Sequence, residues 1–305
     1  MELILPTMLI EKMSDILAEK LIEMDMDARG WAFAKATERQ EQTFIEMLRP
    51  LFAAQEKEVI RNVERRPNRY YASGVRMGDT AGAVVGAHPD AFQAAIAGSS
   101  SLPARSQYKA PGDEWLFDEA EWGTEFQRSG KPLILGAVRD GGEQALIDLG
   151  LAINFNTTHP GVLEFIAEKV PKFSFDVNNT TLDMLRKEFK EAIDEGEGIY
   201  QITKRVEKVF GFTEKYRNER IARTEIIGAT NKGGHEGMRQ SGVVETRIWI
   251  STRDNLTRDS HRAIDGETAP LDGRYSNGLR WPGDYMGPAE EIINCRCTEG
   301  AYSFK

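Results

Sequence analysis

The two cysteines of this 305-residue chain, Cys295 and Cys297, stand near its end with a single residue between them. Together with His261 they supply one imidazole and two thiolates, a donor set that suits zinc. These three residues are therefore the candidate metal ligands. A fourth ligand would come from Asp259, Asp265, His235 or water.

Other interpretations of the same residues stay open. A CxC pair is a poorer two-ligand knuckle than CxxC, so the cysteines could instead close a small domain as buried thiols, with His261 hydrogen-bonded nearby. A hydrolase or nuclease would use His261, Asp265, Cys295 and Cys297 as a metal-dependent catalytic cluster. A Cys–His nucleophile pair lacks any evident orienting group. A Cys295–Cys297 disulfide would close a tight, strained ring, which favours thiols or metal ligands in a reducing compartment.

Three arginines could contact DNA phosphates. Arg217, Arg220 and Arg223 recur every third residue at the start of a helix expected over 214–240, which places them on roughly one face. The chain has a net charge of −9, however, and an acidic chain is not a general nucleic-acid binder. A solvated helix face is the competing interpretation.

Several other classes of protein lack support in the sequence. It contains no GxxxxGK[ST] loop, no GxGxxG after a strand, no GxSxG elbow and no HExxH. The first residues do not form a secretory signal, and no run approaches the length of a membrane span. We therefore expect a cytoplasmic protein, or one assembled in the cytoplasm, with no membrane partner.

The N-terminal half is expected to be helical and then irregular. Helical periodicity appears over 7–23 and 31–63, with Pro50 kinking or dividing the second stretch. Gly, Ala, Ser and Pro dominate 67–114, which predicts a flexible segment. His88, before a proline in this segment, is interpreted as a solvated loop residue.

The C-terminal half predicts helices packed on a small sheet, and hence an α+β fold. One helix should begin at Thr180 or Thr181, and the next should end at Gly211. Alternation over 243–252 predicts a strand that carries Trp249, and a last strand is expected around the cysteines. We expect Trp249 and Trp281 to be buried anchors of this domain.

The C-terminal residues resemble the phage Mu F-like minor head proteins, also called the head-morphogenesis domain. The resemblance lies in the order and spacing of several pieces over about 175–305, namely IARTEIIGATNKGG, RIWISTRDNLTRDSHRAIDGE, PLDG, WPGD and AEEIINCRC. With the periodicity and composition above, it divides the chain into three regions: helical 1–66, a flexible Gly/Ser/Pro-rich segment with connecting helices over 67–171, and the head-morphogenesis domain that the resemblance implies over 172–305.

The resemblance also implies a function. Such proteins are low-copy virion components near the portal vertex, made in the host cytoplasm, that act in procapsid assembly, DNA packaging or DNA delivery. The expected partners are the portal protein, the major capsid or scaffolding protein, and viral DNA. No catalytic residues are established for the group, so we expect no enzyme. Some members carry CxxC where this chain reads Arg258-Asp259-Ser260-His261, which leaves one soft-metal ligand there.

Overall fold

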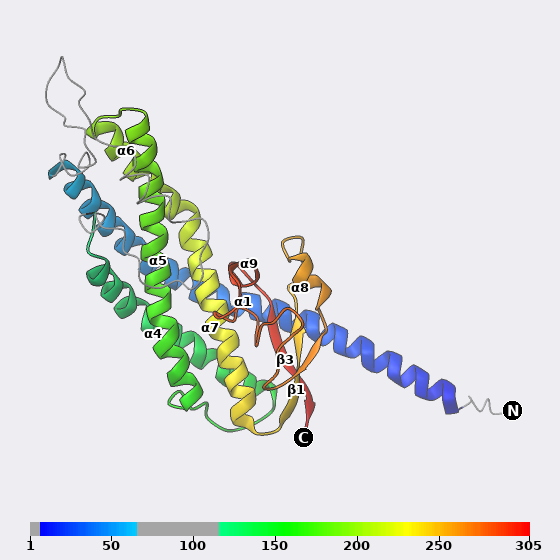
Figure 1. The fold of residues 1–305 in the computed structure, drawn as a ribbon. Helices are drawn as coiled ribbons and strands as arrows, with labels where there is room; N and C mark the ends of the chain where they lie inside the picture. Colours follow the sequence, from blue (N-terminus) through cyan, green and yellow to red (C-terminus); the bar gives the residue numbers. More distant parts are fainter. Residues whose placement is uncertain (1–6, 66–115) are drawn as a thin grey trace, which may run out of the picture. The chain divides into compact units, whose positions relative to one another are not determined.

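The computed structural model describes residues 7–65 and 116–305, and Figure 1 shows its elements. The fold is α+β, with long helices and one small antiparallel sheet near the C-terminus. The expected flexible segment 67–114, with His88, lies outside the described residues. The chain divides into two compact units, unit 1 (Met1–Glu46, Gly130–Val170, Glu219–Lys305) and unit 2 (Met47–Ser129, Pro171–Asn218).

The three longest helices each contain an internal proline. They are α1 (Thr7–Arg65) with Pro50, α4 (Glu119–Asp148) with Pro132, and α5 (Pro160–Asp194) with Pro171. Proline removes one helical hydrogen bond but does not necessarily end a helix. The expectation of two separate helices over 7–23 and 31–63 is therefore wrong, because α1 is continuous.

The helix expected to begin at Thr180 or Thr181 is instead the second half of α5. The hydroxyl of Thr180 donates to the carbonyl of Asp176 at 2.7 Å, and that of Thr181 donates to Val177 at 3.0 Å. Threonine side chains make this bond to the preceding turn inside helices, so a threonine alone does not mark a helix start. The domain boundary expected at residue 172 falls inside α5.

Gly211 does not end its helix either. Helix α6 (Ile199–Phe212) runs directly into the π-helical turn η2 (Thr213–Arg217), and α7 (Asn218–Ser241) follows without a break. Within unit 2, the aromatic ring of Phe126 packs on Phe52 and Phe173, with ring centroids 5.3 and 6.2 Å away. This aromatic cluster lies in the core of unit 2 and is supplied by three different helices.

Unit 1 contains a helix crossing built on glycine. A Cβ atom on Gly233 of α7 would lie 2.0 Å from the carbonyl oxygen of Val138 in α4. Likewise, a Cβ on Gly141 would lie 2.1 Å from the carbonyl oxygen of Thr230. Glycine is therefore required for the backbones of α4 and α7 to approach this closely. Gly233 and Gly237 of NKGGHEG therefore allow the packing of α7 on α4.

The sheet of unit 1 has the order β2-β1-β3, with all pairs antiparallel. Its strands are β1 (Val244–Ile250), β2 (Thr268–Pro270) and β3 (Thr298–Phe304). The last strand was expected around the two cysteines. In the structure β3 begins at Thr298, so both cysteines lie just before it.

Alternation along β1 gives the sheet two buried faces. Ile248 and Ile250 pack with Met26 of α1, whereas Trp249 belongs to a second cluster that includes Cys295 and Cys297. The expected burial of the two tryptophans is confirmed, since Trp249 is 0% and Trp281 is 2% exposed. Among the described helices, none is both long and apolar enough to cross a membrane.

Candidate functional site

His261 occupies the short helix α8 (Asp259–Ala263) and is buried. Its Nε2 lies 2.8 Å from Oε2 of Glu291, which belongs to α9 (Ala289–Ile292). Its ring packs edge-on against Trp249, with centroids 5.1 Å apart. A carboxylate only accepts hydrogen bonds, so Glu291 favours a proton on Nε2 and leaves the lone pair of Nδ1 facing away from it.

Cys295 and Cys297 lie in the turn between α9 and β3, and both are free and buried. The preceding residue, Asn294, has a left-handed φ of 61°, which asparagine tolerates better than most residues. Thr224 Oγ1 accepts a bond from the Asn294 amide at 2.9 Å, and Arg223 donates to its side chain at 2.7 Å. Helix α7 therefore holds this turn in place.

The three predicted ligands come together. Nδ1 of His261 lies 3.6 Å from Sγ of Cys295 and 3.4 Å from Sγ of Cys297. The three ligand atoms all lie within 4.8 Å of one another. The contact between the two thiols lowers the pKa of Cys295. The same contact raises the pKa of Cys297, and burial of Cys297 raises that pKa further. The arrangement suits either a hydrogen-bonded thiol pair or a soft metal ion.

The suggested fourth ligands lie elsewhere. Asp265 accepts hydrogen bonds from the Ser251 amide at 2.8 Å and from Arg253 at 2.7 Å. The side chain of Asp259 is exposed, and His235 contacts Glu299 at 3.1 Å. In the parts of the chain that the structure describes, no further His, Cys, Asp or Glu joins the three ligands.

A buried ionic network lies in the same unit, and sequence reasoning missed it. Glu299 of β3 accepts hydrogen bonds from Arg247 at 2.6 Å, from Tyr275 at 3.0 Å and from His235 at 3.1 Å. The side chains of Arg247 and Glu299 are 0% and 1% exposed. Burial alone would raise the pKa of Glu299, but Arg247 and His235 hold it below its ordinary value. In the sequence, Arg247 lies two residues before Trp249 and therefore on the same face of β1. This position was the signal that could have predicted a buried charge.

Asn231 is a second residue that the sequence did not single out. Its Nδ2 donates to the carbonyls of Pro282 and Cys297, each at 2.9 Å, and its Oδ1 accepts from Thr298 at 2.8 Å. One side chain of α7 therefore joins the WPGD loop to the end of the CRC turn. Three of the sequence pieces that carry the family resemblance, IARTEIIGATNKGG, WPGD and AEEIINCRC, therefore meet at Asn231.

The three arginines considered for DNA contact have different environments. Arg217, in unit 2, is 2% exposed and donates to Thr181 Oγ1 at 2.8 Å and to the Val177 carbonyl at 2.6 Å. Arg223, in unit 1, pairs with Glu41 at 3.3 Å besides its bond to Asn294. Among the three arginines, Arg220 is the one whose side chain is exposed.

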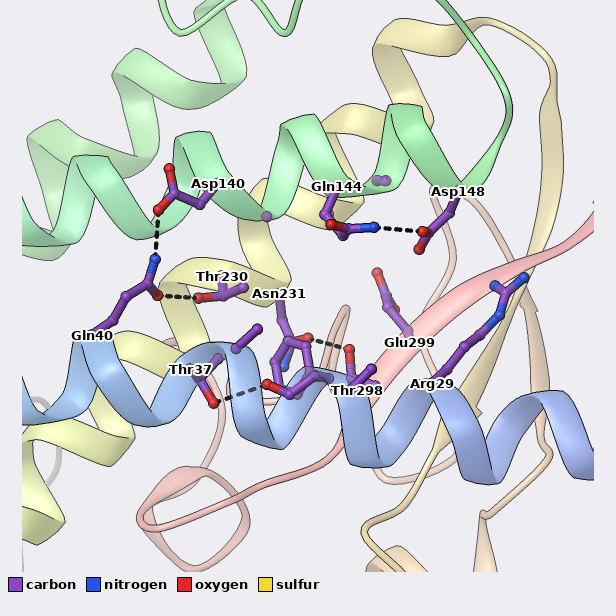
Figure 2. A pocket seen from close by; sticks show the side chains of 16 residues that line it. Arg29, Thr37, Gln40, Asp140, Gln144, Asp148, Thr230, Asn231, Thr298 and Glu299 are labelled. Carbon is purple, nitrogen blue, oxygen red and sulfur yellow. Dashed lines mark hydrogen bonds between the residues drawn. The ribbon is translucent and has the colours of Figure 1, made fainter.

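A cavity of about 370 Å³ lies in unit 1 between α1, α4, α7 and β3 (Figure 2). Its polar side chains are largely bound to each other. Gln40 donates to Asp140 at 2.7 Å, and Gln144 donates to Asp148 at 2.7 Å. The lining is mostly small residues and amides, so it defines a shape without indicating a particular ligand chemistry.

Comparison with known proteins places these features in one segment. Residues 183–299 match the model of a family described as Phage Mu protein F like protein, and this segment includes His261, Cys295, Cys297 and the Glu299 network. The curated protein YqbB of Bacillus subtilis (strain 168), which is named as uncharacterized, is 22% identical over 190 residues. That match covers 60% of this chain and 62% of YqbB, so the chain spans less than two thirds of this relative. No solved structure matches the chain significantly.

Proposed function

We propose, from the premise that residues 183–299 belong to the phage Mu protein F-like family, that this chain is a minor head protein of a phage or prophage. In this role it takes part in head morphogenesis and becomes associated with the virion. The family match is the observation that carries the proposal. The finer role is a place at the portal vertex, in low copy number, during procapsid assembly, DNA packaging or DNA delivery.

The partners follow from that role. The portal protein is the first, and the major capsid or scaffolding protein and the viral DNA are further partners. Of the three arginines, Arg217 is buried and Arg223 is paired with Glu41, which argues against a broad DNA-binding face built on these three side chains. Phosphate affinity requires several accessible cations, and the chain as a whole is acidic.

A non-enzymatic role is consistent with how the buried polar groups are used. Arg247 and Glu299 are bound to each other in the core. Lys232 pairs with Glu236 at 2.6 Å, and this pair is also buried. Such internally paired charges stabilise a fold in which these groups face each other. Asp265, required by the hydrolase interpretation, is engaged by Arg253 and the Ser251 backbone.

Deletion of the gene from the phage or prophage that encodes it tests the role. We expect fewer DNA-filled heads by electron microscopy of induced lysates, with yield restored by the wild-type gene supplied in trans. A chain truncated before residue 183 should fail to restore it. Normal numbers of filled, infectious particles without the gene would contradict a role in head morphogenesis.

A further inference from the structure

We propose that Nδ1 of His261 and the Sγ atoms of Cys295 and Cys297 bind one zinc ion. The proposal rests on the geometry of unit 1 and is independent of the head-protein role. It assigns the cluster a structural task, which is to join α8 to the turn that leads into β3.

The spacing of the ligand atoms fits the ion. Zinc binds thiolate sulfur at about 2.3 Å and imidazole nitrogen at about 2.0–2.1 Å, so a nitrogen and a sulfur on one tetrahedral zinc lie about 3.5 Å apart. The observed separations from Nδ1 to the two sulfurs are 3.6 and 3.4 Å. The two sulfurs thus approach the same nitrogen at the distance that a shared zinc ion would impose.

The count of donors and acceptors also favours an ion. Because Nε2 donates to Glu291, Nδ1 offers a single lone pair, and both thiols face it. One S–H can donate to that lone pair, and the second thiol then has the other sulfur, which is only a weak acceptor, as its partner. A zinc ion engages all three atoms at once. Two S–H bonds break, two Zn–S bonds form, two protons go to solvent, and the bound ion and two thiolates are neutral together.

The surroundings hold the ligands in position. Glu291 binds the far nitrogen of His261 at 2.8 Å, which is the carboxylate–histidine arrangement that commonly supports metal-binding histidines. Arg258 donates to the carbonyl of Ile293 and so ties the start of α8 to the end of α9. Trp249 packs against the ring of His261. Among the described residues, no fourth His, Cys, Asp or Glu joins these three ligands.

The ion would close a long loop. His261 is separated from Cys295 by 34 residues and from Cys297 by 36. The unfolded chain rarely brings ligands this far apart in sequence together, so the ion binds the folded chain and its binding free energy adds to the free energy of folding. Between the two ends lie the PLDG and WPGD turns, which contain little regular structure of their own. Zinc would therefore stabilise the C-terminal part of unit 1.

The test is the metal content of the full-length chain, purified without an affinity tag that binds metal. We expect inductively coupled plasma mass spectrometry to find one zinc ion per chain. The zinc should be lost in the variants His261→Ala and Cys295→Ser. It should be retained in His159→Gln, which is the matched control. Replacement by cobalt should give the thiolate-to-cobalt charge-transfer band of a tetrahedral site.

The wild-type chain alone keeps the proposal testable if a variant fails to fold. Folded wild-type protein that contains no zinc after purification from zinc-supplemented medium, and shows no thiolate-to-cobalt band with added cobalt, would overturn it. A chelator should also lower the thermal midpoint of the wild type, and excess zinc should restore it. No response to either would argue for a hydrogen-bonded thiol pair.

Discussion

At the scale of single residues, Glu291 decides what His261 can do. It accepts a hydrogen bond from Nε2 and so directs Nδ1 at the two sulfurs. Such supporting partners set the orientation of a ligand and its basicity. Glu291 is therefore a positioning residue for the proposed zinc site.

Replacing Glu291 by alanine should weaken zinc binding by about 10–100-fold, the effect typical of removing such a partner. Competition with a chromogenic chelator measures the affinity. Glu290→Ala is the matched control, because Glu290 lies in the same helix with its side chain exposed. Equal affinities for both variants would show that Glu291 does not position the ligand.

The Arg247–Glu299 pair gives a second prediction at this scale. Glu299→Gln leaves the Arg247 guanidinium buried without its counter-charge, and breaking a buried pair in this way costs about 3–5 kcal/mol of stability. Urea unfolding of the full chain measures the loss. Glu245→Gln, an exposed carboxylate on the same strand as Arg247, should change stability by less than about 0.5 kcal/mol. A small effect of Glu299→Gln would mean that water reaches the pair.

His235 should make stability depend on pH. Burial lowers its pKa from the ordinary 6.5, despite the adjacent Glu299, and the nearby Arg247 and Lys232 lower it further. The unfolded chain then takes up a proton at a higher pH than the folded chain, so stability rises with pH. This contribution is complete above pH 6.5 and is lost as the pH falls below it. Glu299, with its pKa below 4.5, stays ionised in this range.

Urea unfolding at about pH 7.5 and about pH 5.5 checks this linkage. We expect the wild-type chain to be less stable at the lower pH. The difference should shrink in His235→Gln, which cannot titrate. An unchanged difference in the variant would assign the pH dependence to other groups.

At the scale of elements, the crossing of α4 and α7 depends on glycines, which have no side chain to separate the two helices. Gly233→Ala adds a Cβ at 2.0 Å from the Val138 carbonyl oxygen, so the two helices must separate. Gly136→Ala, in α4, adds a Cβ with nothing within 4 Å. Alanine is the better helix former by roughly 0.5–1 kcal/mol, so the control should raise stability while Gly233→Ala lowers it. Thermal unfolding of both variants distinguishes the two effects, and a stabilised Gly233→Ala would contradict the close approach.

The elements also show how far the sequence could be interpreted. Alternation of side chains between the two faces of a strand located β1 and placed Trp249 on the face opposite Ile248 and Ile250. Helix ends were harder to predict. Pro50 and Pro171 remain inside helices, and Thr180 and Thr181 bond to the preceding turn instead of capping. Tertiary packing of long helices outweighs these local signals.

The sequence was sufficient to predict the metal-binding side chains of the candidate site, but not the residues that surround and support them. His261, Cys295 and Cys297 stood out because few side chains bind soft metals, and the structure brings them together. Glu291, Asn231 and Glu299 did not stand out, because acids and amides are common and their importance lies in contacts far apart in the sequence. The nearest sequence signal for Asn231 was its place within IIGATNKGG.

At the scale of the whole molecule, the family segment begins inside α5 and ends in β3, and it contains the proposed zinc ligands. Three long helices contribute residues to both units, so neither unit corresponds to a continuous stretch of sequence. The head-protein role that we propose includes association with the portal, so binding to the portal protein tests it most directly.

Co-expression with the portal protein of the same phage or prophage, followed by size-exclusion chromatography with light scattering, makes that test. We predict one complex whose mass gives a fixed number of copies of this chain per portal ring. Separate elution of the two proteins at micromolar concentration and moderate salt would contradict the portal association.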